Sequence, residues 1–167
     1  MQPLEPPETH YLSAAQGWAE LGNPAEARAE LAQIAEGHQI HPDVLEVRWL
    51  ICAQEGRWDE GLQVARSLLR AAPERASGWL HQSYAIRRAE DGGVKKALEA
   101  LLPAMDQFPK EAIIPYNLSC YSCLLDDLDT ARLLFKRALA IGNKEEIKLM
   151  ALADSDLEPL WPEIRDF

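Results

Sequence analysis

Histidine and cysteine are the side chains of this sequence best able to bind a metal ion or to act as nucleophiles. His38 and His41 stand three residues apart, so their rings could share one helix face. A structural zinc site uses four protein ligands and a catalytic site three, whereas this pair supplies two. The pair also falls where we expect one helix to end before the next begins. We therefore predict hydrogen bonding as the role of these rings, and no bound metal.

Cys120 and Cys123 have the spacing of a redox pair or of half a zinc site. A redox pair of this kind needs the strand–helix surroundings of a thioredoxin-like unit, and the sequence shows no convincing strand. A zinc site would need further ligands, but Cys52 is far away in the sequence. Three cysteines are also too few for a disulfide framework. We expect reduced thiols that pack as small buried side chains.

Acidic pairs occur at Asp126–Asp127, Glu145–Glu146 and Asp154/Asp156. Carboxylates at such positions are stabilised by the unpaired amides and the dipole of a helix N-terminus, and we interpret them as helix-start residues. Gly92–Gly93 stands alone and does not form a glycine-rich phosphate loop. The sequence thus predicts no catalytic residue and no cofactor, and we expect a protein that is not an enzyme.

The net charge of the chain limits the classes of partner that we expect. Its 167 residues carry a formal net charge of −10, with 27 acidic residues against 17 basic ones. Nucleic-acid binding depends on Lys and Arg that neutralise phosphates, so we expect neither nucleic acid nor an anionic membrane as a partner. The segment 1–7 is proline-rich and lacks the basic start and apolar stretch of a secretory signal. We expect a flexible N-terminus and a cytoplasmic protein.

The elements that position these side chains follow a regular period. Small residues recur at separations of 34, 36 and 34 residues. Each is followed, four and seven positions later, by residues that can pack on the same helix face. A second series, at separations of 34, 34 and 36 residues, precedes the first. The small residues are Ala27, Gly61, Ala97 and Ala131, and the preceding series is Tyr11, Leu45, Trp79 and Pro115.

A turn separates the two series in each unit. The turns contain Gly22-Asn23-Pro24, Gly56-Arg57, Asp91-Gly92-Gly93 and Asp126-Asp127. Asn and Asp are suited to cap the following helix, and Pro to open it. The sequence therefore predicts four helix–turn–helix units, at about 8–41, 42–75, 76–111 and 112–143, followed by a capping segment at 144–167.

This period resembles that of the tetratricopeptide repeat, a helix–turn–helix unit of 34 residues. The run from Gly56 to Gly61 is similar to the turn of that family, and Pro73 and Pro109 stand where it often ends a repeat. The tail around Asp154-Ser155-Asp156-Leu157 resembles the closing segment of some bacterial members. The resemblance implies an all-α fold, a right-handed superhelix of stacked helix pairs with a C-terminal capping helix. Pentatricopeptide repeats have a similar length, but they bind RNA and are basic, so the acidic charge disfavours them.

The resemblance also implies a function. First helices of stacked pairs line a concave wall, so we expect a non-enzymatic protein- or peptide-binding scaffold or adaptor. A self-associating structural subunit is the alternative, and light scattering would separate the two. A clamp for the carboxylate of chaperone tails is not expected, because the matching positions lack its cations. The wall residues implied by the family geometry are Leu12, Gln16, Glu46, Leu50, His81, Tyr84, Arg88, Tyr116, Asn117 and Cys120. We predict that Tyr84, Arg88, Tyr116 and Asn117 lie side by side at its centre.

The large apolar residues lead to predictions about the core and the capping segment. Trp18, Trp58 and Trp79 fall on packing positions, whereas Trp49 stands where the period has a small residue, so a core and an exposed position both stay open. In the capping segment, we expect side chains that cover Leu133 and Phe135 of the last repeat. These are Leu149, Leu152, Leu157 and Trp161.

Overall fold

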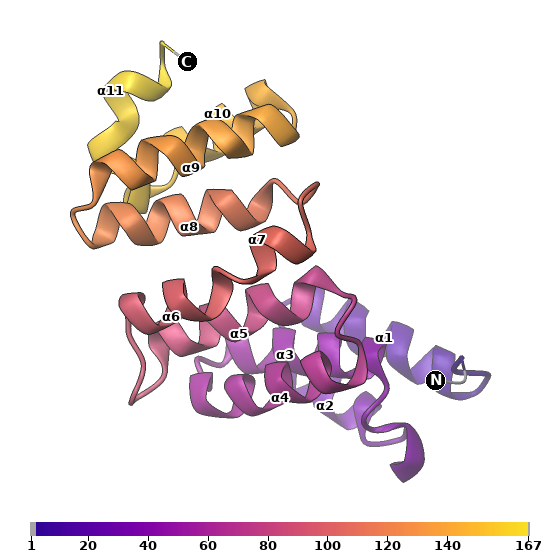
Figure 1. Ribbon diagram of the computed structural model, residues 1–167. Helices are drawn as coiled ribbons and strands as arrows, with labels where there is room; N and C mark the ends of the chain where they lie inside the picture. Colours follow the sequence, from indigo (N-terminus) through magenta and orange to yellow (C-terminus); the bar gives the residue numbers. More distant parts are fainter. Residues whose placement is uncertain (1–2, 167) are drawn as a thin grey trace. The chain divides into compact units, whose positions relative to one another are not determined.

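The structure is a computed structural model that describes residues 3–166, and over that range it contains helices and no strand (Figure 1). The predicted all-α fold class is confirmed. The chain divides into two compact units, one ending at Asp91 and the other beginning at Gly92.

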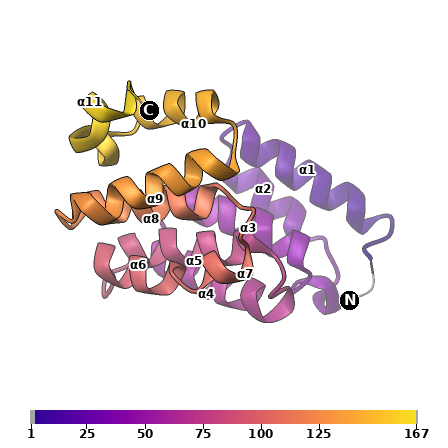
Figure 2. The same cartoon turned by 45° about the horizontal axis from the view of Figure 1, so that its top comes forward.

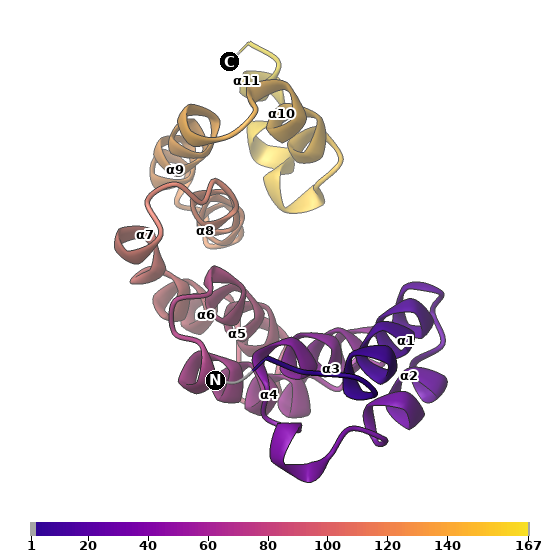
Figure 3. The same cartoon turned by 90° about the vertical axis from the view of Figure 1, so that its right-hand side faces the viewer.

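The first unit consists of helices packed in adjacent pairs. Helix α1 packs against α2 and α3, α3 packs against α4, and α4 packs against α5 (Figure 3). The bounds are α1 (Glu8–Glu20), α2 (Pro24–Leu31), the 3-10 helix η1 (Glu36–His38), α3 (Pro42–Gln54), α4 (Trp58–Ala71) and α5 (Ala76–Arg88).

The second unit is built around α8 and α9, which run side by side (Figure 2). Helix α6 packs against α8, and the C-terminal segment packs against both α8 and α9. The bounds are α6 (Val94–Leu101), α7 (Ala104–Gln107), α8 (Ile113–Leu124), α9 (Leu128–Ile141), α10 (Lys144–Leu152), the 3-10 helix η2 (Ser155–Leu160) and α11 (Trp161–Ile164).

Three of the predicted turns share one backbone geometry. Gly22, Gly56 and Asp126 all have positive φ, at 73°, 68° and 60°. In each turn the next N–H bonds back across the end of the helix, as from Asn23 N to Trp18 O at 2.9 Å, which satisfies a carbonyl that the helix end leaves free. The predicted caps are also present, because Asp127 Oδ1 accepts a hydrogen bond from Thr130 N at 3.1 Å.

The small residues of the period allow the helices to approach each other closely. Ala27, Ala97 and Ala131 are fully buried. A Cβ at Gly61 would lie 3.5 Å from the Cβ of Cys52, so α3 and α4 are already close there. Small side chains at these positions therefore set the spacing of the helix pairs.

Some helices end earlier than the period predicts. Helix α6 stops at Leu101, because Pro103 has no N–H to continue the ladder, and α7 follows. Helix α2 stops at Leu31, although Ile34 beyond it is 3% exposed and still packs in the core. The boundary between the two units falls in the turn at Asp91–Gly92, within the third predicted repeat.

The C-terminal segment covers one side of the α8–α9 pair. Its buried side chains pack with Phe135 and Tyr116, and Trp161 Nε1 donates a hydrogen bond to Ala151 O at 2.9 Å. The segment is helical as predicted, but Leu149 is 70% exposed because it lies on the face of α10 away from Ile147 and Ala151. The buried side chains are Ile147, Ala151, Leu157, Leu160 and Ile164.

The expectations for four other large side chains need correction. Leu133 is 71% exposed, although we expected the cap to cover it. It lies on α9 next to Leu134, which points into the core and is 7% exposed. Trp18 is 38% exposed and so lies outside the core. Trp58 and Trp79 are half-buried rather than fully in the core.

Candidate functional site

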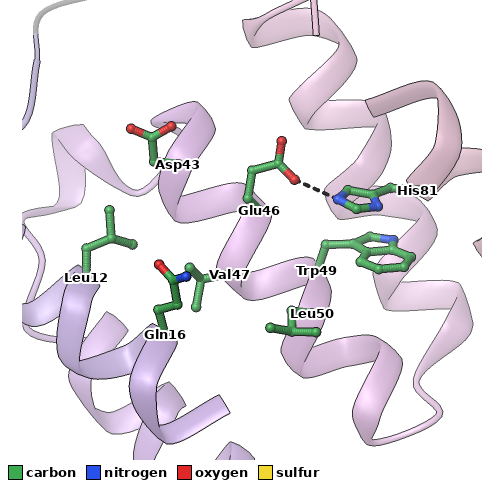
Figure 4. Close-up of a pocket in the computed structure, with 8 residues that line it drawn as sticks. All are labelled: Leu12, Gln16, Asp43, Glu46, Val47, Trp49, Leu50 and His81. Carbon is green, nitrogen blue, oxygen red and sulfur yellow. Dashed lines mark hydrogen bonds and ion pairs between the residues drawn. The ribbon is translucent and has the colours of Figure 1, made fainter. Parts of the chain in front are cut away.

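Two adjoining cavities lie along the first helices of the first unit. The larger has a volume of about 520 Å³ and the smaller about 470 Å³. They share Leu12, Gln16 and Asp43, so they form one continuous surface, which we call the groove. Figure 4 shows the larger cavity. Its lining residues are Leu12, Gln16, Asp43, Glu46, Val47, Trp49, Leu50 and His81.

Helix periodicity brings these side chains together. Asp43, Glu46, Val47 and Leu50 follow the i, i+3, i+4, i+7 spacing, which places them on one face of α3. Across from them, α1 supplies its own polar and apolar groups four residues apart, and α5 supplies His81. The aliphatic side chains give the cavity an apolar lining with carboxylates beside it (Figure 4).

Glu46 is the best-anchored acidic group of the groove. One carboxylate oxygen accepts a hydrogen bond from Ser77 Oγ, and the other lies 2.6 Å from His81 Nε2. Burial disfavours the charge of Glu46, but the bonds from His81 and Ser77 outweigh it and lower the pKa of this carboxyl below its ordinary 4.5. Glu46 is therefore a carboxylate at neutral pH, and it ties α3 to α5.

The Trp49 and His81 rings stack at one end of the cavity. Their centroids are 3.8 Å apart and their planes differ by 9°. Trp49 is 9% exposed, and its Nε1 would lie 3.7 Å from a Cβ at Gly61, so the missing side chain of Gly61 makes room for the indole. The structure thus places Trp49 in the core. The stack holds the His81 ring with Nε2 toward Glu46 (Figure 4).

The smaller cavity is lined by the side chain of Arg75, which is paired with a carboxylate. Arg75 Nη1 lies 2.7 Å from Asp43 Oδ1 and links the start of α5 to α3. His41 is buried, and its Nδ1 accepts a hydrogen bond from Asp43 N at 3.3 Å. His38 instead lies 2.6 Å from Glu8 Oε2. Both histidines therefore have the hydrogen-bonding roles that the sequence predicts, and they have different partners.

Comparisons with known proteins identify the fold. A thermophilic TPR protein of Thermus thermophilus, TTC0263, matches with a TM-score of 0.73 and 22% identity, over 94% of this chain and 82% of that one. A double mutant of MamA from RS-1 matches with a TM-score of 0.68 and 19% identity, over 81% and 75% of the two chains. MamA from AMB-1 matches with a TM-score of 0.64 and 17% identity, over 96% and 91%.

The fold is that of a tetratricopeptide-repeat protein. The resemblance seen in the sequence is thereby confirmed at the level of fold. No known family profile matches the chain, and a search of curated proteins found no match either.

Half of the predicted wall residues lie together in the tetratricopeptide fold of the first unit. All five line the larger cavity, from α1, α3 and α5 (Figure 4). Whether they contact a partner stays a prediction. These residues are Leu12, Gln16, Glu46, Leu50 and His81.

Tyr84 and Arg88 lie on α5 but outside the residues that line the cavity. The Tyr84 ring packs against Trp49, with centroids 6.2 Å apart. The Arg88 guanidinium lies 4.9 Å from the centre of the Trp58 ring and donates a hydrogen bond to Tyr84 O at 3.2 Å. These contacts turn Arg88 toward α4, where a cation–π contact holds it.

The remaining wall residues are buried in the second unit, which corrects their assignment to an open surface. Tyr116 is 3% exposed and its hydroxyl donates to Asp154 Oδ2 at 3.0 Å. Cys120 is 2% exposed and contacts the same oxygen. Asn117 is 6% exposed and its amide donates to Ile113 O. The capping segment thus uses Tyr116 and Cys120 as its docking surface. Because Tyr84 and Arg88 belong to the first unit, the predicted juxtaposition of the four residues stays a prediction.

Cys120, Asp154 and Asp156 are the one group of potential metal ligands among the residues the structure describes, with their ligand atoms within 4.8 Å of one another. Hydrogen bonding accounts for the position of Asp154, because Oδ1 accepts from Asp156 N as a helix cap and Oδ2 accepts from Tyr116. Burial raises the pKa of Cys123 to about 11 and also raises that of Cys120, so both thiols stay protonated at neutral pH.

The sequence analysis missed three residues of the larger cavity. Asp43 and Val47 lie three residues before Glu46 and Leu50, so the helical spacing of these two wall residues could have found them. Trp49 had no such signal, since its position follows from the space beside Gly61 and the His81 ring.

No helix of the described residues is long and apolar enough to span a membrane.

Proposed function

We propose that this protein is a non-enzymatic scaffold that binds a segment of a partner protein in the groove of its first unit. The observation that carries the proposal is the pair of adjoining cavities along α1, α3 and α5, which share Leu12, Gln16 and Asp43. Because the cavities adjoin along three helices, they offer one continuous surface on which an extended chain can lie. A segment held there would bury apolar surface against the aliphatic wall, the main source of affinity in such grooves.

The groove is held in shape before a partner arrives. Two links join α3 to the start of α5, one from Asp43 to Arg75 and one from Glu46 to Ser77 and His81. On the other side of the repeats, Arg28 of α2 pairs with Glu55 at the end of α3. A wall fixed in this way loses little entropy on binding, which favours affinity for a flexible segment.

The proposal is tested by selecting peptides from a random displayed library on the immobilised protein. Gln16 is exposed and lines both cavities, so Gln16→Trp should fill the groove without disturbing the core. Gln63→Trp, at an exposed position on α4, is the matched control. We expect selected peptides to bind the wild type and Gln63→Trp alike, and Gln16→Trp at least about tenfold more weakly, a loss of about 1.4 kcal/mol. Equal binding to all three proteins would place the binding surface elsewhere.

A further inference from the structure

Every Asp, Glu, Lys or Arg side chain that lines the larger cavity is acidic. Its wall contains two carboxylates, Asp43 and Glu46, and no Lys or Arg. Arg75, which pairs with Asp43, lines the smaller cavity. A ligand in this cavity therefore meets carboxylates and no Lys or Arg side chain on the wall itself.

Both carboxylates keep capacity to accept further hydrogen bonds. An ionised carboxylate offers about four acceptor positions, and the bonds to Glu46 come from Ser77 and His81, one on each oxygen. Its side chain remains 26% exposed, and that of Asp43 remains 48% exposed. Each carboxylate can thus accept a further donor without losing its present partners.

The rest of the wall suits an aliphatic side chain. Leu12, Val47 and Leu50 face the space between α1 and α3 (Figure 4). Gln16 donates from Nε2 to Glu20 at 2.9 Å, which leaves its carbonyl as another acceptor toward the groove. Acceptors and aliphatic groups therefore lie next to each other on the wall.

We propose that the segment taken up by the groove carries a Lys or Arg side chain beside an aliphatic one. The cation binds the Asp43 and Glu46 carboxylates, and its neighbour packs on the Leu12, Val47 and Leu50 wall. This inference rests on the proposed function and names its ligand class. An acidic segment would place like charges together in a partly buried site, which costs affinity and so excludes such partners.

The sequences of the selected peptides provide the first test. We expect Lys or Arg next to Leu, Ile, Val or Met in most peptides that the wild type enriches over Gln16→Trp. Enrichment of acidic or uncharged peptides would overturn this inference and leave the peptide-binding function intact. Absence of any enrichment over Gln16→Trp would instead overturn the proposed function and this inference with it.

A matched set of synthetic peptides and variants provides the second test. In the best peptide, norleucine replaces the Lys or Arg, and the affinity for the wild type should fall about tenfold, as for loss of a hydrogen bond to a charged group. The same replacement should have almost no effect on binding to the double variant Asp43→Asn, Glu46→Gln. Asp59→Asn removes one exposed carboxylate from α4, as Asp43→Asn does from the groove, and it should keep the full tenfold effect.

Three results would contradict the assignment. In the first, the norleucine peptide binds the wild type as tightly as the parent peptide does. In the second, N-acetylation of the peptide weakens binding while the norleucine replacement does not, so the cation that binds is the peptide's amino terminus. Because Glu46 also links α3 to α5, the single variant Asp43→Asn and a thermal melt of each protein accompany the measurement. The proposal would also be overturned if the norleucine replacement weakens binding by the full tenfold in both the folded Asp43→Asn protein and the folded double variant.

Discussion

At the scale of single residues, Glu46 connects the stability of the repeats with the chemistry of the groove. It joins α3 to α5 through His81 and Ser77, and it faces the larger cavity (Figure 4). The pKa of its carboxyl is lowered in the folded protein, because the bonds that favour the charged form outweigh the cost of burial. Folding therefore depends on the ionisation of Glu46.

This linkage predicts a pH-dependent effect of Glu46→Gln. A lowered pKa contributes stability above the ordinary value of 4.5, and the contribution is lost as the pH falls through the pKa of the folded state. We expect the variant to have a free energy of unfolding lower by about 1 kcal/mol at neutral pH. Urea denaturation should show this difference shrinking as the pH is lowered below 4.5.

Glu90→Gln provides the control for this pH series, because it makes the same change at an exposed carboxylate in the turn after α5. Its free energy of unfolding should follow that of the wild type at every pH. If Glu46→Gln is as stable as the wild type at neutral pH, or if its deficit is the same in acid, the charge of Glu46 does not hold α3 to α5.

At the scale of elements, the capping segment shows which helix faces carry the fold. Leu157, Leu160 and Ile164 are fully buried against the α8–α9 pair, whereas Leu149 on α10 is 70% exposed. The sequence correctly predicted a helical cap, because its tail resembles the closing segment of some bacterial tetratricopeptide arrays. It did not assign the faces of α10, because Ile147 and Leu149 are both apolar and lie on opposite sides of that helix.

Two leucines of the capping segment therefore make a matched pair for substitution. Leu157→Ala removes a fully buried side chain and should lower the free energy of unfolding by about 2–5 kcal/mol. Leu149→Ala changes an exposed residue in the same segment and should stay within about 0.5 kcal/mol of the wild type. Urea unfolding followed by circular dichroism measures both, and similar losses for the two variants would show that the segment does not pack as described.

At the scale of the whole molecule, the sequence predicted the fold better than the site. The recurrence of Ala27, Gly61, Ala97 and Ala131 reports helix packing directly, because a larger side chain would separate each pair. The site depends on contacts between residues distant in sequence. Tyr116 has the helical phase of a wall residue, but the tail supplies Asp154 as its hydrogen-bond partner and covers it. A repeat pattern contains no information about that contact.

The central claim, that the first helices of the first unit bind a partner segment, is tested most directly by amide hydrogen exchange. The exchange of the full chain is measured alone and when saturated with a peptide selected on the wild type. We predict slower exchange in α1, α3 and α5, whose side chains line the groove, and unchanged exchange in α9 and α10. Slower exchange confined to α9 and α10, or no change in α1, α3 and α5 while the peptide is bound, would contradict the account.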